Sequence, residues 1–206
     1  MSCLELDFLE ARSRRFALAL WLQHVQETTS RSMASHSISF ASAKTPVLRH
    51  LFTSAGHNYF GHYGGAPGEH VMVERTEIHC VEGLGIQGDR FFNYKKDYKG
   101  QITFFAYETY ILICEKFGVR DKGPDVFRRN VVAEGVDWMQ FVDAEFEIQG
   151  VRFFGTGECA PCEWMNMAFG SGAEEFLKGQ GGLRAKILSS GILRVSKTWV
   201  NSVHLA

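Results

Sequence analysis

Short runs of β-branched and aromatic residues, separated by glycine-rich turns, dominate this chain from residue 46 onwards. The 206 residues include 21 glycines and 17 phenylalanines but only 4 prolines. Branched and aromatic side chains favour strands, and glycine favours tight turns. Many short strands with few helices are typical of sandwiches and barrels. We therefore predict a mainly β fold, a closed β-barrel with a few short peripheral helices.

The individual elements follow from local patterns. Apolar residues recur at helical spacing in residues 107–117, and Gly118 is a stop signal, so this segment is predicted to be a helix. A shorter helix is expected at residues 173–178. Partial alternation between turn signals predicts strands at residues 47–53, 71–81, 101–105, 126–133, 145–148, 151–156, 183–188 and 192–195.

Composition limits the location and the partners of the chain. Residues 1–45 read as an N-terminal extension, a short helix plus a linker rich in Ser, Thr and Ala, and residues 46–206 as one domain. The net charge of −1 provides no attraction for nucleic acid or anionic lipid, and no apolar run approaches the ~20 residues of a membrane span. Five irregularly spaced cysteines suggest no disulfide framework. We predict a cytoplasmic protein that binds neither nucleic acid nor membrane.

The first candidate site is Cys159-Ala160-Pro161-Cys162. A thiolate is a soft metal ligand and a good nucleophile, and Pro161 restricts the shape of the turn that carries it. We expect Cys162 to be the central reactive residue. Half of a zinc site, a redox pair and simple packing are the alternatives, although a zinc site needs further ligands and the chain has no second Cys-x-x-Cys.

A second candidate is the run Gly83-Leu-Gly-Ile-Gln-Gly-Asp-Arg90, whose glycines have the spacing G-x-G-x-x-G. A dinucleotide site needs a helix directly after such a loop, and residues 89–94 do not resemble a helix start. The sequence favours a loop whose backbone N–H groups approach an anion, with Arg90 as a fixed charge beside it. The alternative is an Asp89–Arg90 pair that only braces a turn.

The third candidate is Arg128-Arg129-Asn130, at the expected start of a strand. Guanidinium and amide groups can bind phosphate, carboxylate or a heterocycle through paired hydrogen bonds. Because successive strand residues point to opposite faces, Arg128 and Asn130 are expected on one side and Arg129 on the other. An ordinary charged surface is the alternative.

Taken in order, Gly88-Asp-Arg-Phe-Phe92, Phe127-Arg-Arg-Asn130 and Cys159-Ala-Pro-Cys162 resemble the motifs of MOSC domains, named for the C-terminal part of molybdenum cofactor sulfurase. The resemblance covers about residue 46 to the C-terminus and implies a β-barrel with an essential cysteine. It implies a molybdenum–pterin cofactor, with Cys162 as catalytic residue and metal ligand. Asp89 and Arg90 match a Gly-Asp-Arg element. Arg128 and Asn130 match an Arg-Pro-Asn element in which Arg129 replaces proline. These four would bind the cofactor.

The resemblance also implies the reaction. Relatives that carry this cofactor reduce N-hydroxylated compounds, so a small-molecule substrate and a molybdenum-dependent oxidoreductase activity are expected. No flavin, haem or iron–sulfur motif occurs in the chain, so electrons would come from a partner reductase. His57 and His62, in a loop without an assigned family counterpart, are candidate proton donors or plain surface histidines.

Two other functions remain open at this point. In one, the chain is a persulfide sulfur carrier, a sulfur transferase. It would receive sulfur on Cys162 from a pyridoxal-phosphate-dependent cysteine desulfurase, for assembly of a metal–sulfur cofactor, with Cys159 as resolving thiol. In the other, it is a non-catalytic cofactor-binding module.

Overall fold

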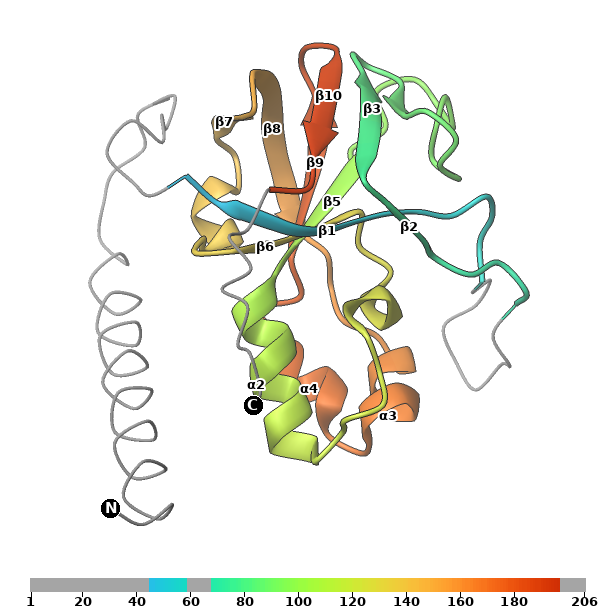
Figure 1. Cartoon of the computed structure of the whole chain (residues 1–206), viewed down its shortest axis with the longest axis vertical. Coiled ribbons are helices and arrows are strands. Elements are labelled where there is room, and N and C mark those ends of the chain that lie inside the picture. The colour runs from blue at the N-terminus through green and yellow to red at the C-terminus, as the bar shows by residue number, and fades with distance from the viewer. Residues whose placement is uncertain (1–44, 59–67, 197–206) are drawn as a thin grey trace, which may run out of the picture. The chain divides into compact units, whose positions relative to one another are not determined.

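The computed structural model describes residues 45–58 and 68–196, and these belong to one unit that spans His36–Ala206. Its main element is a seven-stranded sheet (Figure 1), in which the neighbouring β5 and β6 are parallel and the other neighbours antiparallel. In spatial order its strands are β2 (Val73–Arg75), β1 (Val47–Thr53), β6 (Val131–Glu134), β5 (Ile102–Ala106), β9 (Leu183–Ile187), β8 (Val151–Glu158) and β7 (Glu145–Ile148).

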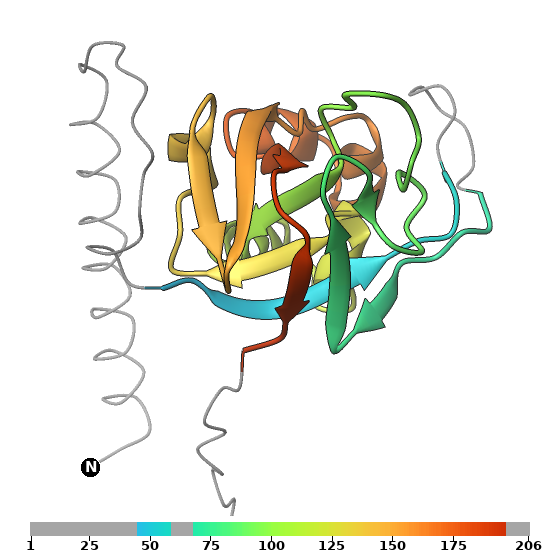
Figure 2. The ribbon, with the colours of Figure 1, turned by 90° about the horizontal axis from the view of Figure 1, so that it is seen from above.

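A second sheet has three strands, β10 (Gly191–Arg194), β3 (Glu77–Val81) and β4 (Gly85–Ile86), in that order. The chain after β10 meets β1, where the Ser196 amide donates to the Leu48 carbonyl at 2.9 Å. Figure 2 shows the strands of this small sheet running across β1. Among the described residues the strand pairing forms two open sheets, so the mainly β fold is confirmed and the closed barrel is not.

Helices cover one face of the large sheet. They are α2 (Tyr107–Phe117), α3 (Trp164–Phe169) and α4 (Ala173–Leu177), which lie together below β1 and β6 in Figure 1 and pack against residues of β1, β5 and β6. Two short 3₁₀ helices, η2 (Pro124–Phe127) and η3 (Trp138–Phe141), lie in the connections. None of the helices in the described part is long and apolar enough to cross a membrane.

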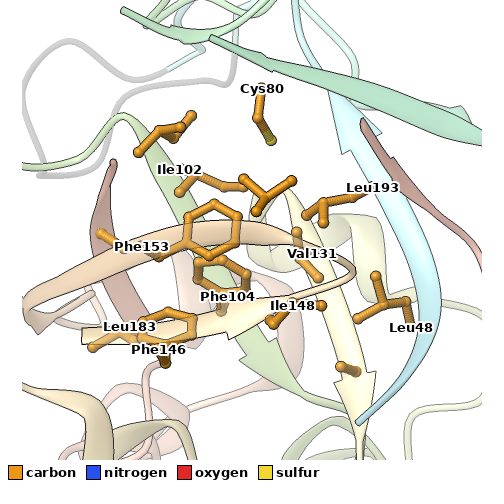
Figure 3. Packing of buried hydrophobic residues seen from close by; sticks show 14 of the residues in the cluster. Leu48, Cys80, Ile102, Phe104, Val131, Phe146, Ile148, Phe153, Leu183 and Leu193 are labelled. Carbon is orange, nitrogen blue, oxygen red and sulfur yellow. The ribbon is translucent and has the colours of Figure 1, made fainter. Parts of the chain in front are cut away.

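The central strands are buried on both faces of the large sheet. Because successive side chains of a strand point to opposite faces, the buried residues form two hydrophobic clusters, one on each face. Phe104 packs with Trp138 and Phe153 between the sheets, as Figure 3 shows in part, whereas its neighbour Phe105 stacks on Phe127 at a ring-centroid distance of 4.2 Å under the helices. Both Phe104 and Phe105 are 0% exposed. Burial of each such side chain contributes roughly 1.5–3 kcal/mol, which makes β5 the anchor of both layers.

Local signals predicted several elements correctly. The helix α2 ends where expected, because Gly118 adopts the left-handed conformation at φ 66° and its amide bonds back to the last turn. The strands at residues 47–53 and 145–148 also match.

Two expectations were wrong in detail, and one helix was not predicted. The strand expected at residues 71–81 is split at Thr76, so that β2 joins the large sheet and β3 the small one. The strand expected at residues 126–133 begins only at Val131, after η2 and a left-handed Arg128. Helix α3 was not foreseen. It buries Met165, Ala168 and Phe169 on one face, which is helical spacing in a segment too short to be conspicuous.

Candidate functional site

The glycine-rich run forms a β-hairpin. Gly83 and Gly88 have φ of 70° and 80°, and the turn returns the chain from β3 to β4. The amides of Gln87 and Asp89 donate to the carbonyls of His79 and Ile86 at 2.9 and 3.0 Å. These two N–H groups are thus used inside the hairpin, which carries the chain directly to Asp89 and Arg90.

Asp89 and Asn130 meet at the centre of the site, although 41 positions separate them. Asn130 Nδ2 donates to Asp89 Oδ2 at 3.2 Å, and the Ser54 amide donates to the same oxygen at 3.1 Å. The Asp89 and Asn130 residues are 6% and 1% exposed. The first two sequence motifs are therefore joined through buried polar groups.

Arg90 and Arg128 connect the same two motifs a second time. Arg90 Nη1 lies 3.4 Å from Asp89 Oδ2, and its Nη2 donates to the Arg128 carbonyl at 3.2 Å. Burial lowers the pKa of Arg90, and the Asp89 charge opposes that shift. Arg128 donates to Ser54 Oγ, the Gly56 carbonyl and the His70 carbonyl.

Arg129 extends the network to the cysteine segment. It donates to the carbonyls of Phe127, Gly181 and Cys159 at 2.7, 3.1 and 3.0 Å. Arg128 and Asn130 thus reach one side of the chain and Arg129 the other, as the alternation argument predicted. The backbone that achieves this is a left-handed turn rather than a strand.

The two thiols differ in environment. Cys159 is 5% exposed, and this burial raises the pKa of its thiol, although the charges of Arg129 and Arg184 and a hydrogen bond with Arg184 oppose the shift. Cys162 is half-buried, at the turn before α3, where its carbonyl accepts from the Met165 amide at 2.8 Å. The cysteine that faces the arginines most directly is the buried one.

Two glycines directly before β9 allow close backbone contacts, Gly181 with the cysteine segment and Gly182 with β5. A Cβ at Gly181 would lie 2.3 Å from the Cys159 carbonyl oxygen, and one at Gly182 would lie 2.2 Å from the Phe104 carbonyl oxygen. Gly182 also has φ 95°. These glycines, together with Ser54 and Arg184, were not predicted as site residues. The Gly-Gly pair directly before an expected strand was the available signal.

An aromatic loop lies beside Arg90. Phe91 is 4.8 Å from His57 and 5.1 Å from Tyr98 between ring centroids, and the Arg90 guanidinium lies 4.9 Å over the Phe91 ring. Burial, followed by the charge of Arg90, lowers the pKa of His57. His57 is thus brought to the edge of the site, whereas His62 lies outside the described residues.

The three motifs therefore converge on one polar network, and residues 88–198, which contain all three, match the MOSC domain family. The chain belongs to the MOSC domain family. No curated protein sequence matches it. Within the described residues, no group of three or more His, Cys, Asp and Glu side chains is placed to hold a metal ion.

Solved structures support the fold of this MOSC domain. The YUAD protein from Bacillus subtilis superposes with a TM-score of 0.57 at 17% identity, over 75% of this chain and 94% of that one. YiiM from Geobacillus stearothermophilus superposes with a TM-score of 0.51 at 12% identity, over 72% of each chain. At these identities the likeness concerns the fold alone.

Proposed function

We propose that this MOSC domain binds a molybdenum–pterin cofactor, with the Cys162 thiolate as the protein ligand of the metal. The observation that carries the proposal is the hydrogen bond from Arg129 to the Cys159 carbonyl, which holds a guanidinium group against the segment that bears Cys162. A thiolate is a soft ligand suited to a metal held by other sulfur atoms. Guanidinium groups suit the phosphate of the cofactor.

The charge of the site fits an anionic group. Arg129 hydrogen-bonds to three neutral carbonyls, and neither it nor Arg184 forms an ion pair within residues 45–58 and 68–196. Of the nearby carboxylates, Asp89 is paired with Arg90, Glu158 accepts from the Gly181 amide at 3.0 Å and Glu163 accepts from Asn166 Nδ2 at 2.9 Å. Against these three stand the four arginines at positions 90, 128, 129 and 184. The positive charge of this cluster thus exceeds its negative charge.

The bound cofactor would supply two-electron redox chemistry, which suits removal of oxygen from an N–OH group. The chain's own residues would bind and orient it. Reduction of an N–OH group to N–H and water consumes two protons. The lowered pKa of His57 favours a neutral imidazole at pH 7, so His57 would pass on protons taken from solvent and would not hold one in advance, as the expected proton donor would. Electrons would come from a partner reductase.

Metal analysis tests the proposal directly. Protein expressed with added molybdate is expected to contain stoichiometric molybdenum and a fluorescent pterin. Cys162→Ser should lose the metal, because a hydroxyl is a poor soft ligand. Cys114→Ser is the matched control, since Cys114 is a half-buried thiol on α2, outside the network. Equal molybdenum in Cys162→Ser and wild type would refute Cys162 as the ligand.

The sulfur-carrier alternative uses Cys162 without a metal. Burial raises the pKa of Cys159, which makes it a poor resolving thiol and disfavours this alternative. Transfer of ³⁵S from cysteine to Cys162 by a cysteine desulfurase, in protein free of molybdenum, would replace the reductase proposal. Molybdenum binding without turnover of any N-hydroxylated compound under a chemical reductant would indicate a non-catalytic module.

A further inference from the structure

The side chain of Asn130 has no hydrogen-bonding capacity left for a ligand. Its Oδ1 accepts from the amide and the hydroxyl of Thr103 at 3.1 and 2.8 Å. Its Nδ2 donates to the Phe52 carbonyl and to Asp89 Oδ2, both at 3.2 Å. A carboxamide offers two lone pairs and two N–H groups, so all four are used inside the protein.

Four donors converge on the Asp89 carboxylate, three of them on Oδ2. Oδ1 accepts from the Phe91 amide at 3.1 Å, and Oδ2 accepts from the Ser54 amide, Asn130 Nδ2 and Arg90 Nη1. The side chain is 1% exposed. A buried side chain held by this many donors is fixed in place.

Arg90 is the group that these contacts hold. Its side chain is 7% exposed, and it is gripped on one side by Asp89 and on the other by the Arg128 carbonyl. Arg128 has φ 57°, a left-handed conformation, at the residue that presents this carbonyl. A chain of contacts thus runs from Asn130 through Asp89 to the Arg90 guanidinium.

We propose that Asp89 and Asn130 are positioning residues that touch no ligand, and that they fix the Arg90 guanidinium so that its charge serves the anion site beside the cysteine segment. The ligand part of this inference rests on the proposed function. The positioning part concerns the free protein alone.

Asp89→Asn separates positioning from simple electrostatics. Removal of a negative charge beside Arg90 should strengthen anion binding if only net charge matters. If positioning matters, binding should weaken about tenfold, because a carboxamide cannot accept from all the donors that converge on Asp89 and Arg90 loses a charged partner. The probe is inorganic phosphate, titrated by calorimetry at fixed ionic strength. Unchanged or tighter binding in Asp89→Asn would overturn the inference.

Thr103→Val is the matched structural control. It removes the hydroxyl that bonds Asn130 but leaves the contact between Asn130 and Asp89. We expect lower stability with phosphate affinity unchanged. Asn130→Ser, which removes the donor to Asp89, should weaken phosphate binding. If Thr103→Val weakens binding as much as Asn130→Ser, the effect is general destabilisation and the inference fails.

A ligand-free readout keeps the two proposals distinguishable. In NMR spectra the Nη resonances of Arg90, assigned by their loss in Arg90→Lys, should be separate in wild type, because a gripped guanidinium rotates slowly. They should merge in Asp89→Asn and persist in Thr103→Val. Merged resonances in wild type would refute positioning. If the Arg90 Nη resonances are separate in a wild-type protein that binds neither phosphate nor cofactor, the positioning inference stands and the proposed function is refuted.

Discussion

Replacement of Arg129 by lysine tests whether the link between the arginine and cysteine segments is part of the fold. Arg129 bridges three carbonyls at 2.7–3.1 Å, and the lysine ammonium group keeps the charge but lacks the planar fork. A hydrogen bond with a charged donor contributes about 1.5–3 kcal/mol. If lysine preserves one of the three bonds and water partly replaces the others at this half-buried site, the net loss is about 2–3 kcal/mol.

Urea unfolding provides the measurement. With an m-value of about 2 kcal/mol/M, this loss corresponds to a midpoint lowered by about 1 M. Arg152→Lys is the matched control, because Arg152 pairs at 3.1 Å with Glu145 on an exposed surface, with side chains 54% and 45% exposed. Such a pair contributes about 0–1 kcal/mol. If Arg129→Lys unfolds at the same urea concentration as Arg152→Lys, the bridge does not stabilise the fold.

Three further predictions concern other parts of the domain. Burial raises the pKa of Cys80 to about 12, so mass spectrometry should find it unalkylated by iodoacetamide at pH 9 in the folded protein. Gly182→Ala, whose Cβ would meet the Phe104 carbonyl oxygen, should lower the free energy of unfolding by more than Gly150→Ala, where φ is 81° but no atom lies within 4 Å; equal losses in urea titrations would contradict the clash. The pKa of His57 is lowered, so the unfolded chain binds the proton more readily and this residue's contribution to stability should fall as pH drops below 6.5. An NMR titration midpoint at or above 6.5 would be inconsistent with this.

Elements with a local signal were predictable, and those set by tertiary contacts were not. Helix α2 combines an apolar period with a glycine stop, and both belong to its own sequence. The strand expected at residues 126–133 has equally apolar residues, yet Pro124 starts a 3₁₀ turn and Phe127 turns into the second core. The burial of Phe127 against Phe105 favours the 3₁₀ turn over a strand, and local sequence does not show this contact because the two residues are 22 positions apart.

The sequence predicted which residues gather at the candidate site but not how deeply their side chains are buried. Arg128 contacts Ser54 and Asn130 contacts Asp89, whereas Arg129 contacts the cysteine segment, which is the grouping that alternation predicted, although the strand on which that prediction rested begins only at Val131. It could not show that Asn130 is 1% exposed, since burial depends on what β1 and β5 place around it. Matching motifs identify which residues gather at a site, whereas the hydrogen-bond geometry distinguishes those able to meet a ligand from those that support them.

Arg129 stands where the MOSC motif has proline, and the backbone of Arg128 has a conformation that a following proline would disfavour. Where the resembling element has proline, this chain has an arginine that bonds three carbonyls, and Arg128 before it adopts φ 57° and ψ 36°. A proline disfavours helical conformations in the residue before it and offers no side-chain donor. Arg129→Pro should therefore lower the urea midpoint further than Arg129→Lys, because backbone strain at Arg128 is added to the lost bonds. If both variants unfold at the same midpoint, the conformation of Arg128 is independent of its neighbour and the coupling argued here is absent.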